Sequence, residues 1–352
     1  MNTKRLPGRI LYYDILNICA CFCVVALHCN GIVHSYSEGS AWKQALVVEV
    51  ACYWAVPVFL MLSGATLIEY RCKYDTKTYI RKRIDRAVFP WLVWSGISLV
   101  WKTAVSHQIS MESWSLANLI SMLLNSKIET KYWFFPSLFA VYMGIPFLAP
   151  FAQDKKNKKL LWYMALLAFI TYSVMPVLCK AMGISWPSAL GFPMASGVFL
   201  FPVLGYLLAT NEISSGVRHA SYVLAAASML LRYFVTLVLS VQDGSTNKTL
   251  FGYIQFHSVF LACAVFLFFK HRDWESLLRK VKISERAIAR ISSCSLGIYL
   301  IHAFVMYYEK QLMDVWETGW KWRILGPFLT WAVSLCIVFC TKKIPGIRKL
   351  FP

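Results

Sequence analysis

Acidic side chains are scarce in this 352-residue chain, with 17 Asp and Glu against 36 Lys and Arg, and charged residues make up only 15% of it. Soluble domains usually contain about 25% charged residues and about 45–50% apolar ones. Here 58% of the residues are hydrophobic and 16% are aromatic. This composition excludes an ordinary water-soluble domain and predicts a chain that is built for lipid.

The familiar sequence signatures of soluble enzymes are also missing. The chain has no P-loop, no G-x-G-x-x-G turn, no H-E-x-x-H motif and no G-x-S-x-G elbow. It contains 11 cysteines but no C-x-x-C pair, and most of them lie within apolar runs, where cysteine behaves as a small hydrophobic residue. We therefore expect no disulfide framework, no metal site and no permanently bound cofactor.

Long apolar runs dominate what is present. A membrane-spanning helix needs about 20 mostly apolar residues, and ten stretches qualify, so we predict an all-α bundle of about ten transmembrane helices in a single domain over residues 1–352. Prolines at 136, 146, 193 and 202 interrupt two stretches and are predicted to kink them rather than break them. The predicted spans are residues 11–31, 44–68, 87–106, 132–152, 160–180, 191–210, 219–240, 250–269, 292–310 and 324–341.

Basic residues gather in alternate loops between the predicted spans. They are concentrated before residue 10 and at 71–86, 155–159, 270–290 and 342–349. The positive-inside rule then places both termini in the cytoplasm. The net charge of +19 follows from this topology and from contact with anionic membrane lipid, so nucleic acid is not expected as a partner.

The first predicted span carries a stripe of polar side chains. At 100° per residue, Asp14, Asn17, Cys21 and His28 fall within about 60° of one another on the helix surface. Such groups inside a membrane usually face a bundle interior or a wet cavity. Asp14 and His28 lie about 21 Å apart along the axis, too far to form a dyad. His28 is the strongest catalytic candidate because imidazole accepts and returns a proton near neutral pH, and a histidine that only hydrogen-bonds across the bundle is the alternative.

Four further residues stand out from the residue pattern alone. Arg86 ends the densest basic run, where guanidinium groups suit phosphate, although membrane anchoring also explains that charge. Arg232 lies inside a span and is expected to pair or to face a cavity. Glu49 is a candidate partner for His28, and Trp133 belongs either to the site or to an aromatic belt at the membrane boundary.

Six segments, in order, resemble the integral-membrane acyltransferase family 3, bacterial proteins that move acyl groups onto sugars and other exported molecules. The resemblance covers nearly the whole chain. The matching segments are YYDILNICACFCVVALH at 12–28, PVFLMLSGATLI at 57–68, RKRIDRAVFPWLVWS at 81–95, WFFPSLFAVYMGIPFLAPF at 133–151, FPVLGYLLA at 201–209 and SCSLGIYLIHAF at 293–304.

The resemblance implies roles for particular residues. The family signature in the first span is an arginine separated by ten residues from a catalytic histidine, and His28 matches the histidine. Asn17 stands at the arginine position and keeps hydrogen bonding without the charge. This departure implies a different acyl donor, a changed transfer route, or another group, such as Arg9 or Arg86, that supplies the charge. The basic residue before the third span corresponds to Arg86, and the late Y-x-x-H element corresponds to Tyr299 and His302. Ser63, in the second matching segment, is a further candidate.

The resemblance also implies an activity. In the implied reaction, an acyl-CoA, in the simplest case acetyl-CoA, is expected to dock from the cytoplasm with its phosphates on Arg83 and Arg86. His28 is expected to act as general base or as transient acyl carrier toward a hydroxyl of an exported or cell-surface glycan or glycolipid. The expected location is the bacterial cytoplasmic membrane. A carrier for a small metabolite or a lipid-linked sugar is the alternative, although the inverted repeats that would support it are not apparent.

Overall fold

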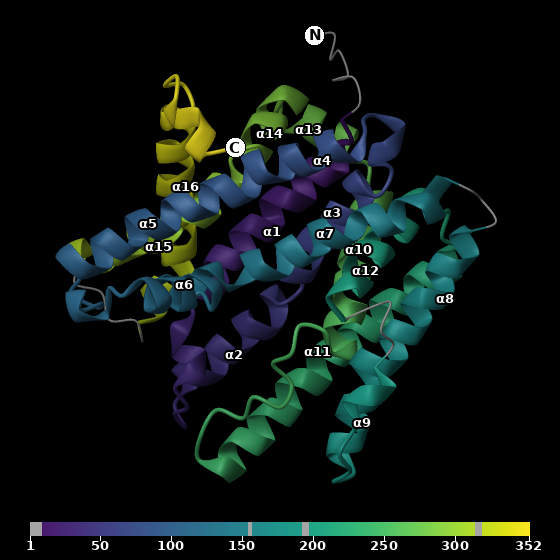
Figure 1. The fold of residues 1–352 in the computed structure, drawn as a ribbon. Coiled ribbons are helices and arrows are strands. Elements are labelled where there is room, and N and C mark those ends of the chain that lie inside the picture. The colour runs from purple at the N-terminus through teal and green to yellow at the C-terminus, as the bar shows by residue number, and fades with distance from the viewer. Residues whose placement is uncertain (1–8, 154–156, 192–196, 314–318) are drawn as a thin grey trace.

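The computed structural model describes residues 9–153, 157–191, 197–313 and 319–352, and every regular element within them is helical (Figure 1). The predicted all-α class is therefore confirmed for this part of the chain. Pro193, which we expected to kink a span, and the loop lysines Lys155 and Lys156 lie outside the described residues.

Six helical segments are long and apolar enough to cross a membrane, and together they identify a multi-pass membrane protein. A seventh is added if a pair of helices bent by 55° counts as one span. The six comprise α1 (Leu11–Cys29), α2 with α3 (Ser40–Cys52 and Ala55–Leu67), α7 (Phe134–Gln153), α8 with α9 (Lys158–Ala168 and Met175–Ala181), α11 (Ser215–Asp243) and α16 (Trp320–Thr341), and the bent pair is α14 (Glu285–Ser292) with α15 (Ser295–Met313).

The predicted count of ten spans is not confirmed and stays a prediction. Three of the ten stretches form helices of 16, 14 and 16 residues, namely α5 (Phe89–Ala104), α10 (Gly197–Thr210) and α12 (Phe256–His271). These are shorter than the roughly 20 residues that a straight span needs. The remaining helices are α4 (Thr76–Arg83), α6 (Leu116–Leu124) and α13 (Trp274–Lys280).

The helix formed by the end of the basic segment at 71–86 runs on into the next predicted span. α4 continues through a π-helical turn, Ile84–Val88, directly into α5. A π turn inserts one residue into the helical ladder and often marks a functional position. It carries Arg86, and α4 ends at Arg83, so both predicted phosphate contacts lie at this junction.

Helix α1 occupies the middle of the bundle (Figure 1). One of its faces contributes Leu16, Ala20 and Val24 to the larger apolar core, which α3, α7, α10 and α12 complete. Another face contributes Cys21 and Val25 to a second core with α15 and α16. The polar stripe of α1 therefore lies between two apolar clusters, where neighbouring helices enclose it.

Helices α3 and α10 approach each other closely through glycine. A Cβ atom on Gly64 would lie 1.9 Å from the Pro202 carbonyl oxygen, and one on Gly205 would lie 2.0 Å from the Met61 carbonyl oxygen. Small residues at such crossings allow membrane helices to pack backbone against backbone.

We therefore expect Gly64→Ala to destabilise the bundle, because backbone rather than a flexible side chain must move to make room. Overpacking costs roughly 1–3 kcal/mol, and we expect a loss of stability near the upper end of this range. Thermal unfolding of the purified protein in detergent measures the effect. Gly96→Ala is the matched control, since a Cβ there meets nothing within 4 Å. Equal melting temperatures for Gly64→Ala and the wild type would contradict this account of the crossing.

Candidate functional site

A cavity of about 1180 Å³ runs beside α1. Asp14, Asn17, Val24 and His28 all line it, so it follows the helix for about 21 Å at 1.5 Å per residue. We call the region around α4 and the π turn the basic end of the cavity, and the region around His28 the histidine end. The side chains at the basic end are Arg81, Arg83, Arg86, Lys342, Arg348 and Lys349.

At the histidine end, His28 from α1 meets His302 from α15. The His28 Nδ1 and His302 Nε2 atoms lie 2.7 Å apart, and the ring planes differ by 10°. His302 is fully buried, whereas His28 is partly exposed and lines the cavity. The structure thus brings together the two histidines that the sequence singled out, from positions 274 residues apart.

The hydrogen bonds of His302 determine which nitrogens carry protons when both rings are neutral. The His302 Nδ1 atom lies 2.7 Å from the Tyr299 carbonyl oxygen, which only accepts, so Nδ1 donates. Nε2 of His302 is then an acceptor and receives the proton of His28 Nδ1. This leaves Nε2 of His28 unprotonated, with a lone pair available as a base.

Tyr299 helps to position the His28–His302 pair. Its carbonyl accepts from His302 one helical turn later, and its hydroxyl donates to the Lys131 carbonyl in the 3₁₀ turn Thr130–Trp133. Nearby, the Tyr132 hydroxyl donates to the Leu300 carbonyl over 2.7 Å. These bonds tie α15 to the start of α7 and hold the His302 ring in place.

The Lys131 segment is further held by charge. Glu129 is buried and lies 2.9 Å from Lys102 and 3.6 Å from Lys131. Burial alone would raise the pKa of Glu129, but Lys131 and Lys102 outweigh it and lower that pKa. Glu129 therefore remains a carboxylate that anchors both lysines near neutral pH.

Asn17 joins α1 to the bend between α14 and α15. Its Nδ2 atom lies 3.0 Å from the Ser292 carbonyl oxygen, the Ser292 Oγ atom and the Ser295 Oγ atom. The amide thus satisfies polar groups freed by the bend, a task that a neutral side chain performs without an additional charge in the bundle. Arg9, considered as a substitute for the missing charge, lines the cavity but is paired with Asp14 at 2.6 Å.

At the basic end, Arg83 lies among aromatic rings and lacks a partner for part of its guanidinium group. Its Cζ atom is 5.4 Å from the ring centre of Tyr142 and 5.7 Å from that of Tyr79. Within the described residues its buried Nε atom has no hydrogen-bond partner. A buried donor without a partner is costly, so this position favours an anionic ligand.

Trp133 lines the histidine end and belongs to a stack of aromatic rings. It lies 5.2 Å from Tyr253, which stacks at 4.1 Å on Tyr53. The guanidinium carbon of Arg232 is 3.5 Å from the Tyr53 ring centre on the opposite side of the stack. Arg232 thus supports the aromatic surface from behind without lining the cavity.

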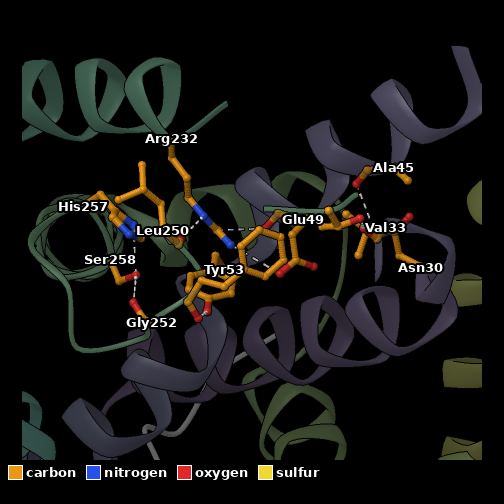
Figure 2. A network of polar contacts seen from close by, with 12 residues as sticks. Asn30, Val33, Ala45, Glu49, Tyr53, Arg232, Leu250, Gly252, His257 and Ser258 are labelled. Carbon is orange, nitrogen blue, oxygen red and sulfur yellow. Dashed lines mark hydrogen bonds and ion pairs between the residues drawn. The ribbon is translucent and has the colours of Figure 1, made fainter. Parts of the chain in front are cut away.

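Figure 2 shows how Arg232 reaches from α11 toward Glu49 and Tyr53. Its Nη2 atom lies 3.4 Å from Glu49 Oε1, its Nε donates to the Leu250 carbonyl, and its side chain is 2% exposed. The prediction that Glu49 pairs with His28 is therefore wrong. The buried Arg232 guanidinium pairs with the Glu49 carboxylate, and His302 occupies the position beside His28.

The remaining predicted site residue, Ser63, lines the cavity with its hydroxyl bonded to the Phe59 carbonyl. Sequence reasoning missed several other lining residues, and no local signal marks them. They are Tyr13, Tyr142, Tyr253, Ser292, Ser295, Lys342, Arg348 and Lys349. Among the described residues, no three His, Cys, Asp or Glu side chains are grouped to hold a metal ion.

Comparison with known proteins gives one match. The family model described as an acyltransferase domain, acyltransferase family 3, matches residues 10–341, nearly the whole chain. No curated protein and no solved structure matches the chain.

Proposed function

Because the chain belongs to acyltransferase family 3, we propose that it moves an acyl group, in the simplest case acetyl, from acyl-CoA to a hydroxyl of an exported or cell-surface glycan or glycolipid. The observation that carries this proposal is the cavity, which has cationic side chains at one end and the His28–His302 pair at the other. A donor with a polyanionic head and a long arm ending in a thioester fits such a cavity.

Arg83 and Arg86 are the proposed contacts for the donor phosphates. Guanidinium groups bind phosphate through paired hydrogen bonds, and the unpartnered Nε of Arg83 supports this role. The two acidic side chains that line the cavity, Asp14 and Asp85, lie 2.6 Å from Arg9 and 3.9 Å from Arg81, respectively. They therefore leave the charge of Arg83 and Arg86 available to the donor.

The proposed chemistry uses the lone pair on Nε2 of His28. The acceptor hydroxyl attacks the thioester carbonyl while Nε2 of His28 takes the hydroxyl proton. The C–O bond of the ester forms, the C–S bond breaks, and the proton passes to the leaving thiolate. The hydrogen bond to His302 stabilises the imidazolium that forms on His28. The same lone pair would serve if His28 carried the acyl group as a nucleophile.

The acceptor is proposed to enter at the histidine end. The positive-inside rule puts the basic end toward the cytoplasm, so the histidine end faces the outer side of the cytoplasmic membrane. Trp133 and Tyr253, stacked on each other, line the cavity there, and aromatic side chains offer flat apolar faces. Such faces suit the apolar side of a sugar ring, which would position its hydroxyl toward His28.

Removing the predicted phosphate contacts tests the donor assignment. We expect Arg83→Ala combined with Arg86→Ala to raise the KM for acetyl-CoA on the order of tenfold to a hundredfold, since bonds to charged groups contribute about 1.5–3 kcal/mol. Initial rates in membranes of expressing cells measure this. Lys73→Ala with Lys77→Ala is the control, because it removes two exposed charges from the same region outside the cavity. An unchanged KM in the arginine variant would contradict the donor site.

A further inference from the structure

The segment after α16, residues 342–352, forms part of the cavity wall. Lys342, Arg348, Lys349, Phe351 and Pro352 all line the cavity at its basic end. Figure 1 marks the end of this segment, and its 3₁₀ turn Ile347–Leu350 packs against α5, the helix that continues from the π turn. The basic end is therefore built from two segments far apart in sequence, α4 with its π turn and this C-terminal segment.

Specific contacts hold the C-terminal segment against α5 and α15. The Trp94 indole nitrogen donates to the Leu350 carbonyl over 3.0 Å, and the Phe351 ring packs 5.2 Å from the Trp94 ring. Phe351 is only 4% exposed. A Cβ on Gly297 would lie 3.0 Å from the Phe351 ring, so the absence of a side chain at 297 makes room for it.

The start of the segment is anchored at the bend that Asn17 also contacts. Lys342 Nζ donates to the Ser293 carbonyl over 2.8 Å, next to the Ser292 group bound by Asn17. Between this anchor and Phe351, the 3₁₀ turn Ile347–Leu350 carries Arg348 and Lys349 on exposed positions that face the cavity. The segment is thus fixed at both ends, with two cations between them.

Arg348 and Lys349 have no acidic side chain as an ion-pair partner within the part of the chain that the structure describes. The acidic side chains lining the cavity, Asp14 and Asp85, lie beside Arg9 and Arg81. Cations held together without counter-charge create a positive potential that attracts an anion.

We propose that residues 342–352 form one wall of the donor site and that Arg348 and Lys349 bind phosphate groups of acyl-CoA opposite Arg83 and Arg86. This inference rests on the proposed function and adds to it the residues that recognise the nucleotide part of the donor. The 3′-phosphate carries about −2 charge at pH 7 and is the group best matched to a cluster of adjacent cations. Anionic lipid shares the phosphate chemistry, so the test separates the two sources.

The experiment measures binding of acetyl-CoA and of 3′-dephospho-acetyl-CoA to the purified full-length protein in nanodiscs of phosphatidylcholine. The wild type is expected to bind acetyl-CoA the more tightly of the two. Arg348→Ala with Lys349→Ala is expected to weaken acetyl-CoA binding about tenfold or more and to reduce that preference. The control, Arg279→Ala with Lys280→Ala, removes an equivalent exposed pair outside the cavity and should bind as the wild type does.

A second variant tests the placement of the segment rather than its charge. Phe351→Ala keeps both cations but removes the ring that packs on Trp94, so it should also weaken acetyl-CoA binding. Unchanged binding in both variants, with a wild type that binds acetyl-CoA, would overturn this inference alone. An effect of Arg348→Ala with Lys349→Ala that arises only with phosphatidylglycerol in the nanodisc would assign the segment to lipid and overturn it as well. A wild type that does not bind acetyl-CoA would overturn the proposed function too.

Discussion

A His28→Ala variant is expected to lose about 10²- to 10⁴-fold in the rate of acyl transfer, the range that a positioned general base contributes. The reason is geometric, since Nε2 of His28 is the nitrogen left unprotonated at the histidine end once the bonds of His302 and the Tyr299 carbonyl are assigned. In intact cells this appears as loss of base-labile acyl esters from surface glycans. If His28 is a nucleophile, the loss is at least as large.

Two controls make the His28 result specific. His28→Ala should still insert in the membrane and bind acetyl-CoA, because the basic end of the cavity is unchanged. His219→Ala removes an exposed histidine on α11 that does not line the cavity and should leave the esters at their wild-type level. Normal esters in a membrane-inserted His28→Ala variant would contradict the assignment.

The second large effect is expected at His302, which acts through His28. A His302→Ala variant removes the acceptor for the Nδ1 proton of His28, so the ring is free to adopt the wrong tautomer or orientation. We expect kcat to fall about 10²-fold or more, with little change in KM for acetyl-CoA, because His302 is fully buried and does not line the cavity. Steady-state kinetics with saturating donor separates the two parameters.

Conservative variants distinguish positioning from packing at this residue. The side-chain oxygen of His302→Gln can accept a hydrogen bond near the former Nε2 position, so this variant should recover part of kcat. His302→Met fills a similar volume without an equivalent acceptor and should remain as slow as His302→Ala. Equal rates for the Gln and Met variants would show that His302 merely fills space.

The sequence predicted the helical class and a polar stripe on α1 because both depend on local properties. Apolar length marks membrane helices, and helical periodicity placed Asn17 and His28 on one face. The number of membrane spans was harder to predict from the sequence. Short helices such as α5 and the π turn at Ile84–Val88 depend on packing between distant segments, which hydropathy does not report.

The pairing of individual side chains depends on how the helices pack, which the sequence pattern does not show. The predicted topology places Glu49 and His28 toward the same leaflet, which suggests a pair, but Arg232 on α11 forms an ion pair with this carboxylate. Lys342, Arg348 and Lys349 are indistinguishable in sequence from ordinary positive-inside residues. Their place on the cavity depends on the contacts between Phe351, Trp94 and Gly297, which link segments hundreds of residues apart.

The structure shows which groups the Asn17 side chain contacts. Where the family resemblance led us to expect an arginine, the amide binds the bend between α14 and α15 through Ser292 and Ser295. Lys342 bonds to the same bend. The position of Asn17 is thus linked structurally to the proposed donor wall and, through α15, to His302.

The most direct test of acyl transfer through this cavity follows both halves of the donor at once. Inside-out membrane vesicles from expressing cells would be supplied with acetyl-CoA labelled with ¹⁴C in the acetyl group and with ³H in the adenine. We expect ¹⁴C to enter base-labile esters inside the vesicles with the wild type but not with His28→Ala, while ³H stays in the medium. Movement of both labels together into the vesicles, or ¹⁴C esters at equal levels with His28→Ala, would contradict the account.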